Sequence, residues 1–342
     1  MPKSNQRNIN IDLTKGALVI AMIFYHCTFN ISAQYLYIAH NITETLEFLH
    51  YAFLFISGYL CGFHYLPLSI VGSSHKVGQR LRVRALKIFL IFILGNLTLY
   101  VLGLTYSIDT LLKEITSFHD VATNFILNVN GSFAAFEVLY YIAAFLFLIS
   151  YILTPIRILV FCALMAFIVW NFSEHLFSFV FIGSVGMLLG WLKTRGVFQK
   201  IEQFLEAGNG VFPIILFLLF QIYKSNIYIF YQENTLLVLF MLILETLLWF
   251  ATFISIIKLL KWSWLTNMLV IFGKYTLFAY IVQMFLIRIG AAILGKLGDY
   301  DIIFYTVNLL ISTILLYIVI LLLDNWRKNQ ILVNNIYKRI FL

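Results

Sequence analysis

Long apolar stretches recur along the chain, and short polar segments separate them. About 20 apolar residues are enough for a helix to cross a bilayer. No barrel-like alternation of apolar and polar residues appears, so helices are the expected spanning elements. We therefore predict an all-α polytopic membrane protein of about ten transmembrane helices. The predicted spans are 14–34, 46–66, 83–106, 133–153, 155–171, 176–193, 211–230, 235–259, 267–289 and 301–323.

The composition supports this class. Apolar residues make up 62% of the chain and charged residues only 11%, a balance that is typical of polytopic membrane proteins. Without an internal repeat or a long linker, the simplest partition is one membrane domain over residues 1–342. It would have short cytoplasmic tails at 1–13 and 325–342 and an outer-side segment at 107–131, whose apolar spacing predicts an amphipathic helix.

Basic residues indicate the topology. If the chain has ten spans and a cytoplasmic N-terminus, all but four of the 23 basic residues fall on the cytoplasmic side. The positive-inside rule expects this bias, so both termini should be cytoplasmic. The chain is therefore expected to be an integral, multi-pass membrane protein. The four exceptions are Lys113, Lys224, Arg288 and Lys296.

The first apolar stretch carries two ionisable residues on one face. Lys15 and His26 are separated by roughly three helical turns, or about 16 Å along the axis. Lys15 would therefore lie at an interface and His26 just past the middle of the bilayer. An ionisable group at that depth is a functional hypothesis by default, although a hydrogen-bonded packing histidine is the alternative.

Other polar residues form two predicted layers. A basic rim at the cytoplasmic face could hold phosphates or simply anchor the topology. Deeper in, a carboxylate could orient His26, which could then take a proton from a hydroxyl or amine. We expect Asn96 and Gln283 to form hydrogen bonds between helices. The rim comprises Lys15, Arg80, Arg82, Arg84 and Lys87, and the deeper residues are His26, Glu137, Glu245 and Gln283. The spans also carry Asn30, Lys274 and Arg288.

Some chemistry is not expected. Cys27, Cys61 and Cys162 lie in apolar spans without the spacing of a metal or redox site, so we predict inert thiols and no metal. No nucleic-acid-binding module is visible, because the basic residues follow the membrane rim.

Several segments then resemble a superfamily of bacterial integral-membrane acyltransferases. It includes the acyltransferase-3 family, the glucan succinyltransferases and the heparan-α-glucosaminide N-acetyltransferase-like proteins. Asp12-Leu-Thr-Lys15-Gly16 followed by His26 is similar to the first-helix pattern of that group. Later matches in order are FLFISGYLCG (53–62), RLRVRALK (80–87), FEVLYYIA (136–143), FIGSVGMLLGWL (181–192) and FGKYTLFAYIVQMF (272–285).

The chain departs from the family pattern at specific positions. Lysine replaces the family arginine at Lys15, Lys87 and Lys274, and lysine lacks the two-pronged geometry of a guanidinium. Tyr140 and Gln283 stand where a histidine is common in the family. Because of these departures, any histidine chemistry like that of the family would depend on His26.

The resemblance implies transfer of an acyl group, most often acetyl, from cytoplasmic acyl-CoA to a hydroxyl or amine of an extracytoplasmic carbohydrate or glycolipid. Lys15, Arg84 and Lys87 would then pair with CoA phosphates, with Arg80 and Arg82 adding to the field. His26 would be a general base or a transient acyl carrier, oriented by Glu137 or Glu245. Asp12, Asn30, Tyr140, Lys274 and Gln283 would supply substrate or structural contacts.

Two other interpretations stay open. Intramembrane His and Glu residues also suit a proton-coupled transporter or exporter of a small anion or glycan precursor. A non-catalytic membrane scaffold would tolerate replacement of His26. The sequence specifies neither the acceptor nor the acyl group, and a homo-oligomer stays among the alternatives.

Overall fold

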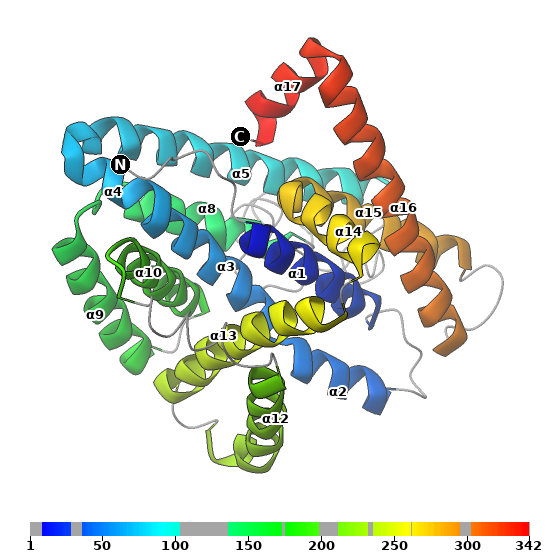
Figure 1. The fold of residues 1–342 in the computed structure, drawn as a ribbon, viewed down its shortest axis with the longest axis horizontal. Coiled ribbons are helices and arrows are strands. Elements are labelled where there is room, and N and C mark those ends of the chain that lie inside the picture. Colours follow the sequence, from blue (N-terminus) through cyan, green and yellow to red (C-terminus); the bar gives the residue numbers. More distant parts are fainter. Residues whose placement is uncertain are drawn as a thin grey trace, which may run out of the picture. The chain divides into compact units, whose positions relative to one another are not determined.

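The computed structural model describes residues 9–28, 36–102, 136–172, 175–197, 211–231, 235–260, 262–294 and 302–341. Within these ranges every regular element is a helix and no strand occurs (Figure 1). The all-α prediction is therefore confirmed for the described part of the chain. The predictions for Asn30 and for segment 107–131 concern residues outside the described ranges.

Six described helical stretches are long and apolar enough to cross a membrane. The chain is therefore treated as a membrane protein, while the number of ten spans and the cytoplasmic termini stay predictions. Three further apolar helices are shorter, at Glu137–Ile149, Pro155–Asn171 and Val211–Lys224. The six long stretches are Ile9–Thr28, Ile42–Gly72, Leu176–Thr194, Leu236–Ile257, Thr276–Leu294 and Ile302–Asn329.

The chain forms two compact units. The first comprises Met1–Leu49, Leu99–Thr105 and Phe253–Leu342, and the second comprises His50–Thr98 and Tyr106–Thr252. Each unit is treated as a separate body, and the expectation of one membrane domain stays a prediction.

The first unit joins the start of the chain to its end. Buried apolar side chains from five of its helices form one core, in which Val19 and Ile23 meet Phe272, Ala279 and residues of the last two helices. Its helices are α1 (Ile9–Thr28), α2 (Leu36–Leu46), α14 (Ser263–Lys274), α15 (Thr276–Leu294), α16 (Ile302–Asn329) and α17 (Ile331–Phe341).

Two features of this unit differ from the sequence prediction. The expected continuous span 267–289 is broken, because α14 ends at Lys274 and Tyr275 has φ −113° and ψ 27° before α15 begins. The expected tail 325–342 continues α16 to Asn329 and then forms α17. Helix α17 is ordered because Tyr337 is buried in the core of the unit and Phe341 packs against that core.

The second unit contains the remaining helices. They are α3 (Phe48–Leu60), η2 (Cys61–Tyr65), α4 (Leu66–Leu68), η3 (Ser69–Ser73), α5 (Ser74–Val101), α8 (Glu137–Ile149), α9 (Pro155–Phe172), α10 (His175–Thr194), α12 (Val211–Tyr231) and α13 (Thr235–Leu260). Helices α3, α5 and α13 also extend into the first unit. Part of the core of this unit is aromatic, because the ring of Phe179 stacks on those of Tyr51 and Tyr141, with centroids 4.5 and 4.0 Å away.

Two short π-helices, η2 and η3, interrupt the long helical stretch that begins with α3. They flank Pro67, which lacks an N–H and cannot continue the α-helical hydrogen bonds. The Ser69 hydroxyl lies 2.7 Å from the Leu66 carbonyl and 2.8 Å from the Leu153 carbonyl. The stretch ends at Gly72, whose φ of 112° allows the chain to turn into α5.

Candidate functional site

Helices α1 and α14 cross at a contact between glycine and backbone. A Cβ atom on Gly16 would collide with the backbone of Leu269, and one on Gly273 would collide with the backbone of Asp12. Small residues of this kind allow membrane helices to approach closely. The crossing therefore brings segment 12–16 against the end of α14, although more than 250 residues separate them along the chain.

Lys15 lies at this crossing with a carboxylate partner on its own helix. Its Nζ is 2.9 Å from Oδ1 of Asp12, and the side chains are 18% and 5% exposed. The two residues are one turn apart on α1, which is the spacing at which helical side chains meet. The charge of Lys15 is therefore balanced in this structure, and a phosphate would have to share or displace Asp12.

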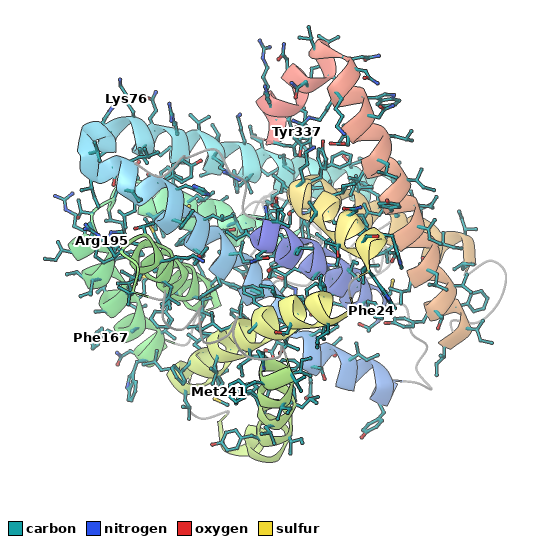
Figure 2. All side chains as sticks on the ribbon, viewed as in Figure 1. Phe24, Lys76, Phe167, Arg195, Met241 and Tyr337 are labelled. Atoms are coloured by element: carbon teal, nitrogen blue, oxygen red, sulfur yellow. The ribbon has the colours of Figure 1, made fainter. Side chains whose placement is uncertain are left out.

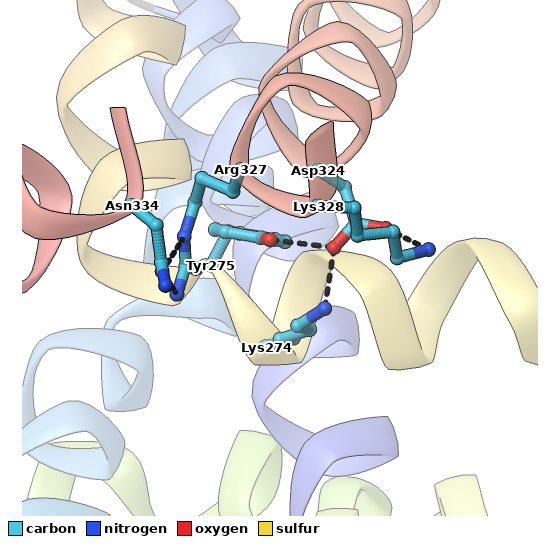
Figure 3. Close-up of polar contacts among 6 residues, drawn as sticks. All are labelled: Lys274, Tyr275, Asp324, Arg327, Lys328 and Asn334. Carbon is cyan, nitrogen blue, oxygen red and sulfur yellow. Dashed lines mark hydrogen bonds and ion pairs between the residues drawn. The ribbon is translucent and has the colours of Figure 1, made fainter. Parts of the chain in front are cut away.

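A larger charged cluster lies at the break between α14 and α15. Lys274, the Tyr275 hydroxyl and Lys328 all bind the carboxylate of Asp324, a buried residue of α16 (Figure 3). Tyr275 donates to Oδ1 at 2.5 Å, and Lys328 lies 2.7 Å from Oδ2. These contacts connect the break between α14 and α15 to the end of α16.

Arg327 completes this cluster on the side of α17. Its guanidinium lies 3.9 Å from the ring centroid of Tyr337 and 5.2 Å from that of Tyr275. It also donates to the side-chain oxygen of Asn334, with Nη2 at 3.1 Å (Figure 3). Lys15, Lys274, Arg327 and Lys328 outnumber Asp12 and Asp324, so this region carries a net positive charge.

His26 lies near the other end of α1 and is 7% exposed. Its ring centroid is 5.4 Å from that of Tyr25 and 6.4 Å from that of Tyr280 on α15. Between Lys15 and His26, the same face of α1 presents Val19 and Met22, which are fully buried. A ligand reaching from one end to the other would therefore have to displace these side chains.

The expectation of interhelical hydrogen bonds from two amides is wrong. Asn96 donates to the Phe92 carbonyl of its own helix at 3.0 Å. Gln283 is fully buried in α15, and neither atom of its amide has a hydrogen-bond partner among the described residues.

The basic run on α5 divides between two sides of the helix. Lys76, Arg80, Arg84 and Lys87 follow a spacing of four or three residues and share one face. Lys76 is exposed and extends from the ribbon (Figure 2). Arg82 lies on the opposite side, with its guanidinium 5.1 Å from the ring centroid of Tyr151.

Glu137 and Tyr140 lie in the first turn of α8. Glu137 accepts a hydrogen bond of 2.7 Å from the hydroxyl of Tyr141, one turn further along the helix. The ring of Tyr140 packs near Phe89 and Phe92 of α5, with centroids 6.4 and 5.8 Å apart. Tyr140 therefore has an aromatic environment in this structure.

Glu245 is fully buried on α13, and both of its carboxylate oxygens have partners on α12. Gln221 donates to Oε1 at 2.8 Å, and Lys224 lies 2.9 Å from Oε2. Burial of an ionic side chain is costly unless such partners bind it. The pair explains how α12 and α13 carry two opposite charges within apolar helices.

A second glycine crossing lies in the second unit. Gly58 meets the backbone of Gly183, Gly62 that of Met187, Gly186 that of Phe55 and Gly190 that of Tyr59. Segments 53–62 and 181–192 therefore interlock through glycines four residues apart on both helices.

The predicted site residues fall into separate groups. Asp12, Lys15, His26, Lys274 and Gln283 belong to the first unit, whereas the α5 basic residues, Glu137, Tyr140 and Glu245 belong to the second. Sequence reasoning missed Asp324, Tyr275, Arg327 and Lys224 as partners. An acidic residue near the end of an apolar span was the available signal for Asp324. No group of three metal-ligating side chains occurs among the described residues.

No family model, curated protein or solved structure matches the chain. The resemblance to membrane acyltransferases therefore stays a prediction.

Proposed function

We propose that the protein transfers an acyl group, most often acetyl, from cytoplasmic acyl-CoA to a hydroxyl or amine of an extracytoplasmic carbohydrate. The observation that carries this proposal is the arrangement of α1. One end meets the positively charged region around Lys15 and Lys274, and the same helix holds the buried His26 about 16 Å further along.

The two ends of α1 have separate roles in this proposal. Lysine and arginine side chains around the helix break attract the phosphates of the donor. His26, held between tyrosine rings, takes the proton from the acceptor hydroxyl or amine as the acyl carbon is attacked. The thioester then breaks, and the thiolate of CoA leaves toward the cytoplasmic side.

Purified full-length protein in nanodiscs provides the test. We expect wild type to bind acetyl-CoA and release free thiol slowly. His26→Ala should keep its affinity within about twofold and lose turnover by roughly 10²-fold or more. Lys15→Ala should weaken affinity by about tenfold, because a charge-assisted contact to phosphate is lost.

A control variant tests whether the effect of His26→Ala is specific to that histidine. His75 is exposed at the start of α5, so His75→Ala should behave as wild type. Absence of any acyl-CoA affinity in wild type would contradict the proposal.

A second candidate is a proton-coupled transporter or exporter of a small anion or glycan precursor. The break at Tyr275 beside the buried Asp324 favours it, because transporters often place broken helices and buried carboxylates at their sites. Under this candidate, wild type binds no acyl-CoA, and Asp324→Asn abolishes proton-driven uptake into proteoliposomes.

A further inference from the structure

Helix α17 has two apolar faces, and one of them packs against other described residues. Tyr337 is 6% exposed, and its ring lies 4.8 Å from that of Phe341 on the packed face. A second stripe at intervals of four residues consists of Leu332, Ile336 and Ile340, which are 71%, 49% and 44% exposed. This stripe has no cover from the described residues.

Basic and aromatic residues accompany the exposed stripe. Lys338 and Arg339 are exposed in the last turns of α17. Lys328 and Trp326 are exposed in the last turns of α16, Trp326 by 55%. An apolar stripe with flanking lysine and arginine is typical of helices that lie in the lipid headgroup layer, and tryptophan is enriched at that depth.

The position of α17 along the chain restricts where this stripe can lie. Gln330 alone separates α17 from the end of α16, the last stretch long enough to cross a membrane. Helix α17 therefore starts at the membrane surface. On its packed face, Tyr337 (labelled in Figure 2) belongs to the same core as Leu316 and Ile320 of α16.

We propose that α17 docks through Leu332, Ile336 and Ile340 onto an anionic lipid surface on the side where the C-terminus lies. Lys338 and Arg339 bind the negative headgroups, and the aliphatic side chains enter the boundary of the acyl chains. Since Tyr337 on the adjacent, packed face contacts Tyr275, lipid docking holds α17 over the charged helix break. This inference is independent of acyl transfer.

An environment-sensitive fluorophore tests the proposal in the full chain. The label is attached to Ile336→Cys and, as a matched control, to Asn335→Cys, an exposed neighbour on another face of α17. The three native cysteines are buried, and wild type treated in parallel measures their labelling. Nanodiscs contain phosphatidylcholine alone or with about one-third phosphatidylglycerol.

We expect a blue-shifted emission at position 336 that brominated lipids quench at least threefold more strongly than at position 335. Removing the charges with Lys338→Gln and Arg339→Gln should abolish the extra quenching that phosphatidylglycerol causes. Lys76→Gln with Arg80→Gln on α5 is the charge-matched control and should leave that quenching unchanged.

Two results would overturn the proposal. Emission typical of water at position 336 in both lipid mixtures would place the stripe in solvent. A label shielded from water and from brominated lipid, in particles of twice the expected protein mass, would show that a second copy of the chain covers it.

Discussion

Two glycine crossings allow a direct comparison between the units. At both, a Cβ atom would collide with the backbone of the facing helix. The α3–α10 crossing is surrounded by apolar and aromatic residues such as Phe55 and Met187. The α1–α14 crossing instead lies beside Lys15, Asp12 and Lys274. Glycine is therefore a packing requirement at both crossings, and only the charges distinguish the α1–α14 crossing as a candidate site.

The largest expected effect tests what the crossings share. Gly16→Val and Gly58→Val should each reduce the free energy of unfolding by about 3 kcal/mol, because the added side chains force two backbones apart. Thermal unfolding in detergent measures both. Ala163→Val on an exposed position of α9 is the control and should change stability little. If one crossing tolerates valine, the two are not equivalent.

The next effect should appear only at the charged crossing. Asp324→Leu removes the partner of two lysines and should cost roughly 2–3 kcal/mol. Adding Lys274→Met should recover part of that loss, since an apolar pair can replace an ion pair. A double-mutant cycle measures the recovery, and Lys328→Met provides the exposed control. Additive losses would mean that Lys274 and Asp324 do not interact.

A smaller effect compares one hydroxyl from each unit. Tyr275 donates to Asp324 at 2.5 Å, and Tyr141 donates to Glu137 at 2.7 Å. Tyr275→Phe and Tyr141→Phe should each cost about 1–2 kcal/mol, because each loses a hydrogen bond to a carboxylate. Denaturation in mixed micelles gives both values. A cost at Tyr275 alone would show that only the cluster in the first unit is energetically coupled.

The smallest effect concerns two arginines over aromatic rings. Arg327→Lys should cost about 0.5–1 kcal/mol, because Arg327 also donates to Asn334. Arg82→Lys should cost less, since Arg82 faces the ring of Tyr151 at 5.1 Å. The difference between the two unfolding temperatures checks this order, and an equal loss would contradict it.

The apolar pattern predicted where helices form but not where they break. Residues 267–289 are apolar on both sides of Tyr275, and the local sequence contains no proline there. At the break, Tyr275 and Lys274 contact Asp324, and Tyr275 also packs against Tyr337 of α17, which lies far along the chain. A pattern that describes one helix at a time cannot contain this information.

The same limit applies to the candidate site. Burial of His26 followed from its position in an apolar stretch. The pairing of Glu245 with Lys224 does not follow, because the topology pattern places Lys224 only as an outer-side charge and gives the depth of each polar residue but not its partner. The amphipathic spacing of residues 331–341 was available in the sequence, although a basic tail was the simpler interpretation.

The π-helices on either side of Pro67 change which neighbours one long helix can reach. Each π-turn holds an extra residue, so every later side chain is rotated by about 100° relative to an uninterrupted α-helix. Before the π-turns, Gly58 faces α10; after the first of them, Ser69 reaches the carbonyl of Leu153 beyond α8. The two halves of this helical stretch therefore present their side chains in different directions: the half with Gly58 toward α10, and the half with Ser69 toward Leu153. Deleting one residue between Cys61 and Tyr65 would rotate Ser69 away from Leu153 and leave Gly58 facing α10.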